Sequence, residues 1–551
     1  MTTMDARLER RPFLERPLLE TLSLDWEKML YAILILAAIV TRFYMLGARV
    51  MSHDESLHTY FAYNLFQGKG FQHTPLMHGP LKFHLAALSY WLLGDSDFSA
   101  RVPTAVFGVA AVVLPMFLHK WLGRTGALAT SLLVLISPFM MYYSRYIRDE
   151  PIVVVWVMLM ALITFSYVEK RDGRWLVGLA AVTALFYTTM ESSFIYVAIW
   201  LLFLGLYILR DVTAMAWPRP EYKRIFLVCV AGAGLAVLAT GTFFYLSRNP
   251  QLLNPNLTAE PLAPQDENTH QIGLPPSPFN TGIAVAGGIA AFFVVAGTAV
   301  FLLAFGQEAR RFPALDLIVI LWTFVMPQLT AFPVAWFGHD PLDYSFQGAL
   351  FTATFLVPIL LVSAAIGLVW NWRKWLVCAG IFYGIYFVFF TTVFTNGNGW
   401  ATGMIGSLGY WLAQQGVRRG NQPPYYYVLV QIPIYEFLPA LGALGAMIYG
   451  LIRWIRAEDV PAESSVVPSG DVEALSGDEN VAPPDNFGAP DNVAAPDGRD
   501  ASSGRDAVRR EGFPAIPFLA FWSVAGVVAF SIAGEKMPWL TTHITLPFIL
   551  L

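Results

Sequence analysis

Long apolar runs recur along almost the whole chain, and they decide what it can fold into. A helix needs roughly 17–25 apolar residues to cross the hydrocarbon core of a membrane. Runs of about this length occupy residues 29–46, 99–119, 126–143, 151–168, 175–190, 193–209, 225–246, 283–305, 314–337, 348–370, 376–394, 427–452 and 513–532, and another begins near 542. The sequence therefore predicts an all-α membrane protein with about 13–14 transmembrane helices.

Composition agrees with this class and excludes others. Of the 551 residues, 56% are hydrophobic and 13% are charged, which is too apolar for a water-soluble protein of this length. The formal net charge of -4 is small, so it gives no reason to expect a nucleic-acid partner. Both cysteines, Cys229 and Cys378, lie inside apolar runs, which argues against a disulfide framework and a thiolate metal site.

The positive charges predict the orientation. The run 82–94 is too short to cross, so we interpret it as an interfacial or re-entrant helix, and 29–46 as a retained signal anchor. One side then receives the Arg-rich leader, Lys120, Arg124, Lys170, Arg171, Arg174, Arg210, Lys223, Arg224, Arg310, Arg311, Arg373, Lys374, Arg453 and Arg456. The positive-inside rule makes that side cytoplasmic. We expect a multi-pass protein of the plasma (inner) membrane with the loop 53–78 exterior.

The chain divides into three parts. Residues 1–456 form the membrane body, and 457–512, rich in Pro, Gly, Ser, Ala and Asp, are typical of a disordered cytoplasmic linker. Residues 513–551 add further membrane segments, and the last run opens so near the end that we expect a truncated chain.

Polar chemistry is concentrated in the first exterior loop. Ser52 followed by Glu55 is a capping-box pattern, so Glu55 has either a structural role at a helix start or a binding role. Asp54 lies in the same first turn, where a helix N-terminus favours a negative charge. This loop and the short run after it hold five of the nine histidines, namely His53, His58, His73, His78 and His84. Such clustering favours a site over ordinary interfacial histidines.

These residues carry a resemblance. The loop that opens with Asp-Glu, the sequence GDSDFSARVP at 94–103 and YSRYIRDE at 143–150 together resemble the GT-C class of membrane glycosyltransferases. Within that class the pattern is most similar to protein O-mannosyltransferases and the bacterial lipid A aminoarabinose transferases. The resemblance covers about the first 210 residues; beyond them it is one of general topology.

The resemblance implies an enzyme that moves a hexosyl or pentosyl group from a polyprenyl-phosphate carrier to an acceptor protein or lipid glycan on the exterior face. It implies Asp54 as general base, with Asp149 of the second acidic loop as the other catalytic carboxylate. The chemistry is reasonable by itself, because a hydroxyl acceptor needs a base, whereas a phosphate leaving group needs cations rather than a general acid.

Where the relatives have Lys-Pro-Pro or His-Pro-Pro, this chain has His78-Gly79-Pro80. The phosphate contact therefore passes to His78, Lys82, Arg148 or Lys536, although both lysines would also suit a role at a membrane interface. Tyr410 and Trp411 are candidates for sugar or acceptor binding, and the aromatic belt of a membrane protein is the alternative.

Asp54, Asp149 and Glu150 offer oxygen ligands of the kind a divalent cation takes, whereas His53 or His78 would suit a softer metal. We expect no required cofactor and leave a divalent cation open, because the O-mannosyltransferase-like members work without one. Two other classes compete with the transferase: a flippase or transporter of lipid-linked sugars, and a membrane scaffold with an incidental acidic loop.

Overall fold

The computed structural model describes residues 25–248, 280–414, 422–423, 425–458, 513–534 and 536–551. The leader 1–24 and residues 459–512 of the predicted linker 457–512 lie outside the described residues, so the prediction of a disordered linker is not tested there. The prediction of an all-α membrane protein is confirmed, because the described residues form helices without a strand.

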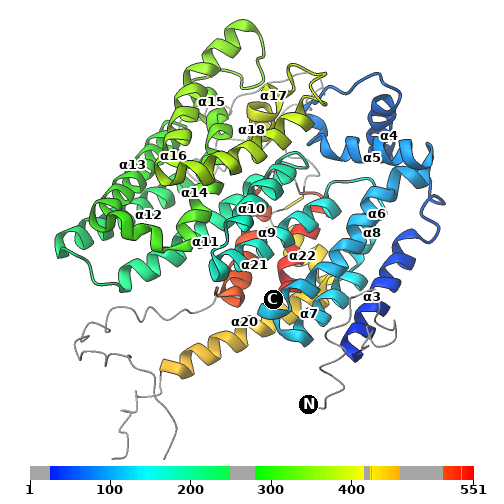
Figure 1. The fold of residues 1–551 in the computed structure, drawn as a ribbon, viewed down its shortest axis with the longest axis horizontal. Helices are drawn as coiled ribbons and strands as arrows, with labels where there is room; N and C mark the ends of the chain where they lie inside the picture. Colours follow the sequence, from blue (N-terminus) through cyan, green and yellow to red (C-terminus); the bar gives the residue numbers. More distant parts are fainter. Residues whose placement is uncertain (1–24, 249–279, 415–421, 424, 459–512, 535) are drawn as a thin grey trace, which may run out of the picture. The chain divides into compact units, whose positions relative to one another are not determined.

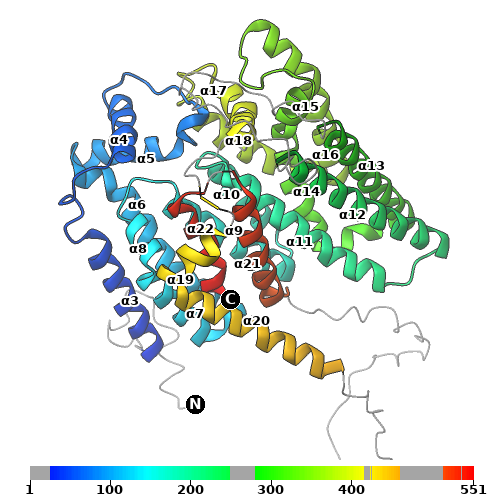
Figure 2. The same ribbon diagram turned by 180° about the vertical axis from the view of Figure 1, so that it is seen from behind.

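The described residues form twenty α-helices, and Figures 1 and 2 label them in chain order. They are α3 (Trp26–Phe43), α4 (His53–Phe66), α5 (Leu81–Leu93), α6 (Asp97–Val113), α7 (His119–Ile136), α8 (Pro138–Tyr143), α9 (Glu150–Lys170), α10 (Gly173–Tyr187), α11 (Ser192–Ala214), α12 (Pro220–Arg248), α13 (Asn280–Phe305), α14 (Pro313–Val325), α15 (Ala331–Trp336), α16 (Phe346–Phe390), α17 (Gly399–Ala401), α18 (Ser407–Gln414), α19 (Ile432–Tyr435), α20 (Phe437–Glu458), α21 (Ala515–Ile532) and α22 (Thr541–Leu550).

Eight described helices are long and apolar enough to cross a membrane, or nine if the broken pair at 426–453 counts as one span. This is fewer than the 13–14 expected, for identifiable reasons. The stretch from α6 to α7 is continuous over 40 residues and α16 over 45, yet non-helical Gly123 and Asn371 divide each into two predicted spans. Three charged residues keep α3 out of the count, and α10 is 15 residues long.

The segment 53–94, which contains the predicted first exterior loop, is a small helical layer with its own core. Helix α5 has 13 residues, too few to span a bilayer, which agrees with the interfacial interpretation of 82–94. Helices α4 and α5 pack together beside the start of α6, as Figure 1 and the reverse view in Figure 2 both show. Phe71, Met77, Phe83 and Ile147 are buried between them.

The main core surrounds α9, which is buried along most of its length. Helices α10, α11, α14 and α16 contribute to this core, and so do α21 and α22 from beyond the linker. The segment 513–551 therefore packs within the same compact unit as residues up to Leu444. A second unit, Gly445–Gly512, contains the end of α20, and its other described residues stop at 458.

Candidate active site

Helix α4 begins with the capping box that the sequence predicts. The Ser52 hydroxyl accepts from the Glu55 backbone, and the Glu55 carboxylate accepts from the Ser52 N–H. The same carboxylate binds Arg101 through both oxygens at 2.8 and 3.1 Å, and Arg49 at 2.8 Å. Glu55 is fully buried. These contacts fix the start of α4, and with it the direction of the neighbouring Asp54.

Asp54 is the carboxylate of this region that solvent reaches, with 38% of its side chain exposed. Its Oδ2 accepts a hydrogen bond from Arg148 at 2.7 Å. Arg148 is itself buried, also binds Glu150 at 3.3 Å, and lies with its guanidinium carbon 3.7 Å from the ring centre of Trp539. A half-exposed carboxylate is thus hydrogen-bonded to a buried guanidinium that stacks on an aromatic ring.

A second charged pair lies fully inside the protein. Lys82 donates to Asp149 Oδ2 at 2.7 Å and to the Nε2 atom of His58 at 3.1 Å. His58 Nε2 can accept because Nδ1 holds its proton against the carbonyl of Ile147 at 3.0 Å. Burial lowers the pKa of Lys82 and raises that of Asp149, and each partner counters the shift of the other.

His78 is bound to a carboxylate that belongs to the start of α11. Its Nδ1 lies 2.7 Å from Glu191 Oε2, and 19% of the His78 side chain is exposed. Burial alone would lower the pKa of His78, but Glu191 and Asp149 outweigh it and raise that pKa. The backbone at His78 has φ 62° and ψ -165°, a conformation that normally requires glycine and costs about 1–3 kcal/mol.

Gly79 occupies a position of the first loop that has no room for a side chain. Its N–H donates to the carbonyl of Thr189, and the N–H of Leu81 donates to that of Thr188. A Cβ at position 79 would lie 2.1 Å from the Thr188 carbonyl oxygen, so only glycine fits. This contact joins the first loop to the end of α10.

The structure pairs Asp54 with Arg148 and Lys82 with Asp149, and Asp149 acts electrostatically on His78. Glu55, next to Asp54, binds Arg101 and Arg49 instead. The remaining candidates are placed differently. Lys536 is buried and donates from Nζ to the carbonyl of Ala533 at 2.9 Å. Tyr410 and Trp411 are half-buried on α18, which packs near the turn Pro75–Met77 and near α15.

Sequence reasoning missed three members of this network: Glu191, His58 in its contact role, and Trp539. Glu191 carried a usable signal, because it is a single carboxylate between two apolar runs, at the predicted exterior side. Trp539 stands in a polar segment that sequence analysis examined only for its lysine. Its contact with Arg148 joins residues 391 positions apart, which periodicity does not reveal.

No group of three His, Cys, Asp or Glu side chains arranged to hold a metal ion occurs among the described residues. The carboxylates of the site instead face side-chain cations. Asp54 and Glu150 contact Arg148, while Asp149 contacts Lys82.

Comparison with known proteins supports the predicted resemblance over part of the chain. Residues 77–239 match the family described as dolichyl-phosphate-mannose-protein mannosyltransferase. This confirms the resemblance to O-mannosyltransferases for the region that contains His78, Lys82, Arg148 and Asp149. A search of curated proteins finds no significant match.

Solved structures of GT-C enzymes are similar at low identity. ArnT from Cupriavidus metallidurans bound to undecaprenyl phosphate is 15% identical, with 77% of this chain and 65% of that chain covered and a TM-score of 0.27. The apo form of the same enzyme is 16% identical, with 73% of this chain and 79% of that chain covered and a TM-score of 0.29. The Archaeoglobus fulgidus oligosaccharyltransferase in complex with zinc and sulfate is 15% identical, with 70% of this chain and 51% of that chain covered and a TM-score of 0.30. A TM-score below 0.5 does not establish a shared arrangement of helices.

Proposed function

We propose that this chain is an integral-membrane glycosyltransferase that moves a sugar from a polyprenyl-phosphate carrier to an acceptor hydroxyl on the exterior face. The observation that carries the proposal is Asp54: a half-exposed carboxylate 2.7 Å from the buried Arg148 guanidinium, beside the enclosed Lys82–Asp149 pair. The family match over 77–239 supports the donor class, since the family is described by a polyprenyl-type mannosyl phosphate.

Asp54 is placed to act as a general base. It takes the proton of the acceptor hydroxyl as that oxygen forms a bond to the anomeric carbon of the sugar. The bond from this carbon to the carrier phosphate breaks, and its electron pair leaves with the phosphate. The products are a glycosylated acceptor and polyprenyl phosphate, and the proton passes from Asp54 to water.

Arg148 serves two purposes in this reaction. It holds the Asp54 carboxylate in place, and it supplies positive charge beside the position where the leaving phosphate gains negative charge. Trp539 and Glu150 fix the guanidinium from two other sides. Because Asp149 is bound to Lys82, we assign these two residues the role of positioning α5 against α9, which sets the geometry of Arg148.

The reaction so described requires no metal ion. The side chains of Arg148 and His78 provide the cations that a divalent ion would otherwise supply. The His78 imidazole, partly exposed and bound to Glu191, is a further contact for the donor phosphate.

The deciding test is Asp54→Asn in the purified protein in lipid nanodiscs. Transfer of labelled sugar from polyprenyl-phosphate mannose to host membrane glycans should fall by about 10²–10⁴, the usual contribution of a general base. Binding of polyprenyl phosphate, followed by native mass spectrometry, should persist. Asp95→Asn is the matched control, because Asp95 is an exposed aspartate in the short connection between α5 and α6.

Two results would contradict the proposal. Equal transfer by wild type and Asp54→Asn would remove Asp54 from the reaction. Translocation of lipid-linked sugar across the bilayer, with no transfer by the wild type in any donor and acceptor fraction, would favour the flippase alternative.

A further inference from the structure

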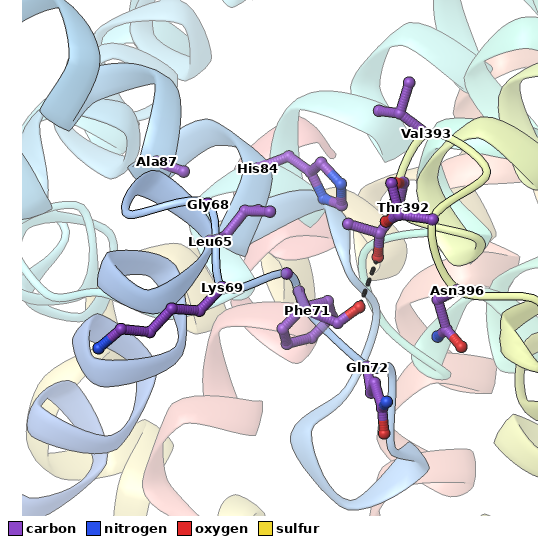
Figure 3. A pocket seen from close by; sticks show the side chains of 12 residues that line it. Leu65, Gly68, Lys69, Phe71, Gln72, His84, Ala87, Thr392, Val393 and Asn396 are labelled. Carbon is purple, nitrogen blue, oxygen red and sulfur yellow. Dashed lines mark hydrogen bonds between the residues drawn. The ribbon is translucent and has the colours of Figure 1, made fainter.

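A cavity separate from the Asp54 site lies at the far end of α4. It has a volume of about 710 Å³, within the ~300–1,000 Å³ typical of small-molecule sites. One wall comes from the end of α4 and the loop after it, another from α5, and the third from the turn that follows α16 (Figure 3). The lining residues are Leu65, Gly68, Lys69, Gly70, Phe71, Gln72, His84, Ala87, Thr392, Val393, Thr395 and Asn396.

A hydrogen bond joins two walls of this cavity, and the turn after α16 that forms one of them has an unusual backbone conformation. The Thr392 hydroxyl donates to the carbonyl of Phe71 at 2.8 Å, which Figure 3 marks with a dashed line. Thr392 and Val393 have φ values of 50° and 54°, in the left-handed region that β-branched residues rarely adopt. Residues in such energetically unfavourable backbone conformations are found especially often at ligand sites. The hydrogen bonds of Val393 and Asn396 to the end of α16 keep the turn in this form.

The chemistry of the lining selects the class of ligand. None of the twelve lining residues, all within the described part of the chain, is Asp or Glu, so the cavity has no carboxylate for a cation. Lys69 is its one cationic side chain, and Figure 3 shows its amine directed away from the wall that carries Thr392 and Asn396. The amides of Gln72 and Asn396 offer donors and acceptors together, as hydroxyl groups require.

His84 adds an acceptor to this set. Its Nδ1 lies 2.9 Å from the carbonyl of Pro80, and a carbonyl can only accept, so Nδ1 carries the proton. Burial lowers the pKa of His84, which keeps the ring neutral and leaves Nε2 as a bare acceptor. Nε2 is buried and has no hydrogen-bond partner in the described residues. A hydroxyl group is the complement to such an atom, whereas an anion is not.

The cavity and the Asp54 site are separate, but helix α4 and the segment from Phe71 to His84 contribute residues to both. Asp54 and Leu65 lie on one helix, eleven residues or about 16 Å apart at 1.5 Å per residue. The segment from Phe71 to His84 begins and ends in the cavity wall, and between them it supplies His78 and Lys82 to the site. On α5, Lys82 and His84 are two positions apart and so point to opposite faces.

We infer that this cavity is a saccharide subsite, which holds a neutral sugar unit of an extended acceptor glycan about 16 Å from the position of transfer. The identification of the glycan as the acceptor rests on the proposed function; the binding of a neutral saccharide does not. The sugar's hydroxyls are bound by Gln72, His84 and Asn396, while Leu65, Ala87 and Val393 contact its C–H faces.

The test measures binding of free saccharides to the full chain in nanodiscs without donor. The probes are mannotriose, maltotriose, chitotriose, free mannose and inorganic phosphate. A trisaccharide should bind the wild type, and Gln72→Ala and Asn396→Ala should each weaken that binding about tenfold, the order of one lost hydrogen bond. Asn398→Ala is the matched control, since Asn398 is exposed, two residues along the same turn and not in the lining. Its affinity should equal that of the wild type.

The inference is overturned if no trisaccharide binds the wild type, if Asn396→Ala and Asn398→Ala bind equally, or if inorganic phosphate displaces the trisaccharide. Asp54→Asn separates this result from the proposed function. Trisaccharide binding that survives Asp54→Asn and depends on Asn396 supports the subsite whether or not transfer depends on Asp54. With donor added, Asn396→Ala should raise the KM for a trisaccharide acceptor and leave kcat unchanged if the glycan is the acceptor. An unchanged KM would overturn the identification of the glycan as the acceptor.

Discussion

Helices α9 and α12 are both apolar enough to cross a membrane, yet the protein uses them in opposite ways. In their most apolar stretches, 83% of α9 is buried within the protein, against 11% of α12. Helix α12 packs mainly against α13, where Gly232 allows the ring of Phe293 to approach closely. Most of the remaining surface of α12 is not covered by the other described parts of the protein.

The difference lies in what precedes each helix. Asp149 stands at the N-cap position of α9, where its side chain binds Lys82 of α5, and Glu150 in the first turn binds Arg148. These charge pairs hold the N-terminal end of α9 among its neighbours. The corresponding charges of α12, Glu221, Lys223 and Arg224, lie at its surface-accessible start. Buried charges need partners, and partners from other helices force a helix into the centre of the protein.

Breaking the Lys82–Asp149 pair should give the largest effect on this comparison. Lys82→Met leaves a buried carboxylate without its cation, and we expect a loss of about 3–5 kcal/mol in the free energy of unfolding. Lys82→Met with Asp149→Leu replaces both charges by apolar groups and should recover most of that loss. Thermal unfolding in nanodiscs measures both variants.

Arg174→Met is the control, because the Arg174–Asp172 pair is solvent-exposed and should contribute little. If the double variant stays as unstable as the single one, the pair does not act as a unit. If it recovers stability and full transfer, Lys82 and Asp149 have no part in positioning the site.

The second test compares the two helices directly with one residue type. Ile152 in α9 is fully buried, whereas Ile225 in α12 is 47% exposed. Ile152→Ala should cost about 2–5 kcal/mol through lost contacts and the cavity that remains. Ile225→Ala should change stability by less than about 0.5 kcal/mol. Equal effects would mean that α12 is covered by protein in its native state.

Sequence predicted the all-α class, most helices and the short length of α5, because apolar run length and helix caps are local properties. The count of spans was less well predicted, since a single residue such as Gly123 or Asn371 decides whether a long helix is continuous. Burial of α9 against exposure of α12 was not predictable, because both read as uniformly apolar runs.

The same limit applies to the site. Asp54 and Glu55 share a predictable helix start, and their different environments follow from Arg148 and Arg101, 94 and 46 residues away. Which cation binds which carboxylate is a property of the tertiary structure. The sequence placed the candidate residues in two polar loops, and the pairing of Lys82 with Asp149 became visible only in the folded structure.

A third test asks whether the segment after the linker holds the start of α9. The Trp539 ring stacks on the Arg148 guanidinium, an interaction of about 0.5–2 kcal/mol when desolvated. Trp539→Leu should therefore reduce kcat/KM for transfer by about 2–30-fold, and Trp539→Phe, which keeps a ring, should lose less. Equal losses in both variants would show that the ring's volume matters rather than its contact with the cation.

The smallest expected effect concerns His78 and Glu191, the pair that fixes the start of α11 as Asp149 fixes that of α9. Burial and Lys82 lower the pKa of His78, but Glu191 and Asp149 raise it above its ordinary value of about 6.5. The folded protein thus holds this proton more tightly than the unfolded chain. The pair contributes its full stability below about pH 6.5, and this contribution is lost as the pH rises through the raised value.

Thermal unfolding between about pH 5.5 and 8.5, the range around the ordinary histidine pKa, measures this contribution. We expect His78→Gln to be less stable than the wild type at the acidic end by about 1 kcal/mol, the order of one hydrogen bond. The difference should shrink toward the alkaline end, because the wild type loses its charged pair and the variant has none to lose. A difference that is constant across the range, or that grows with pH, would mean that His78 contributes to α11 by packing alone, and that the strained backbone at this position is held by the Gly79 contact with Thr188 and Thr189.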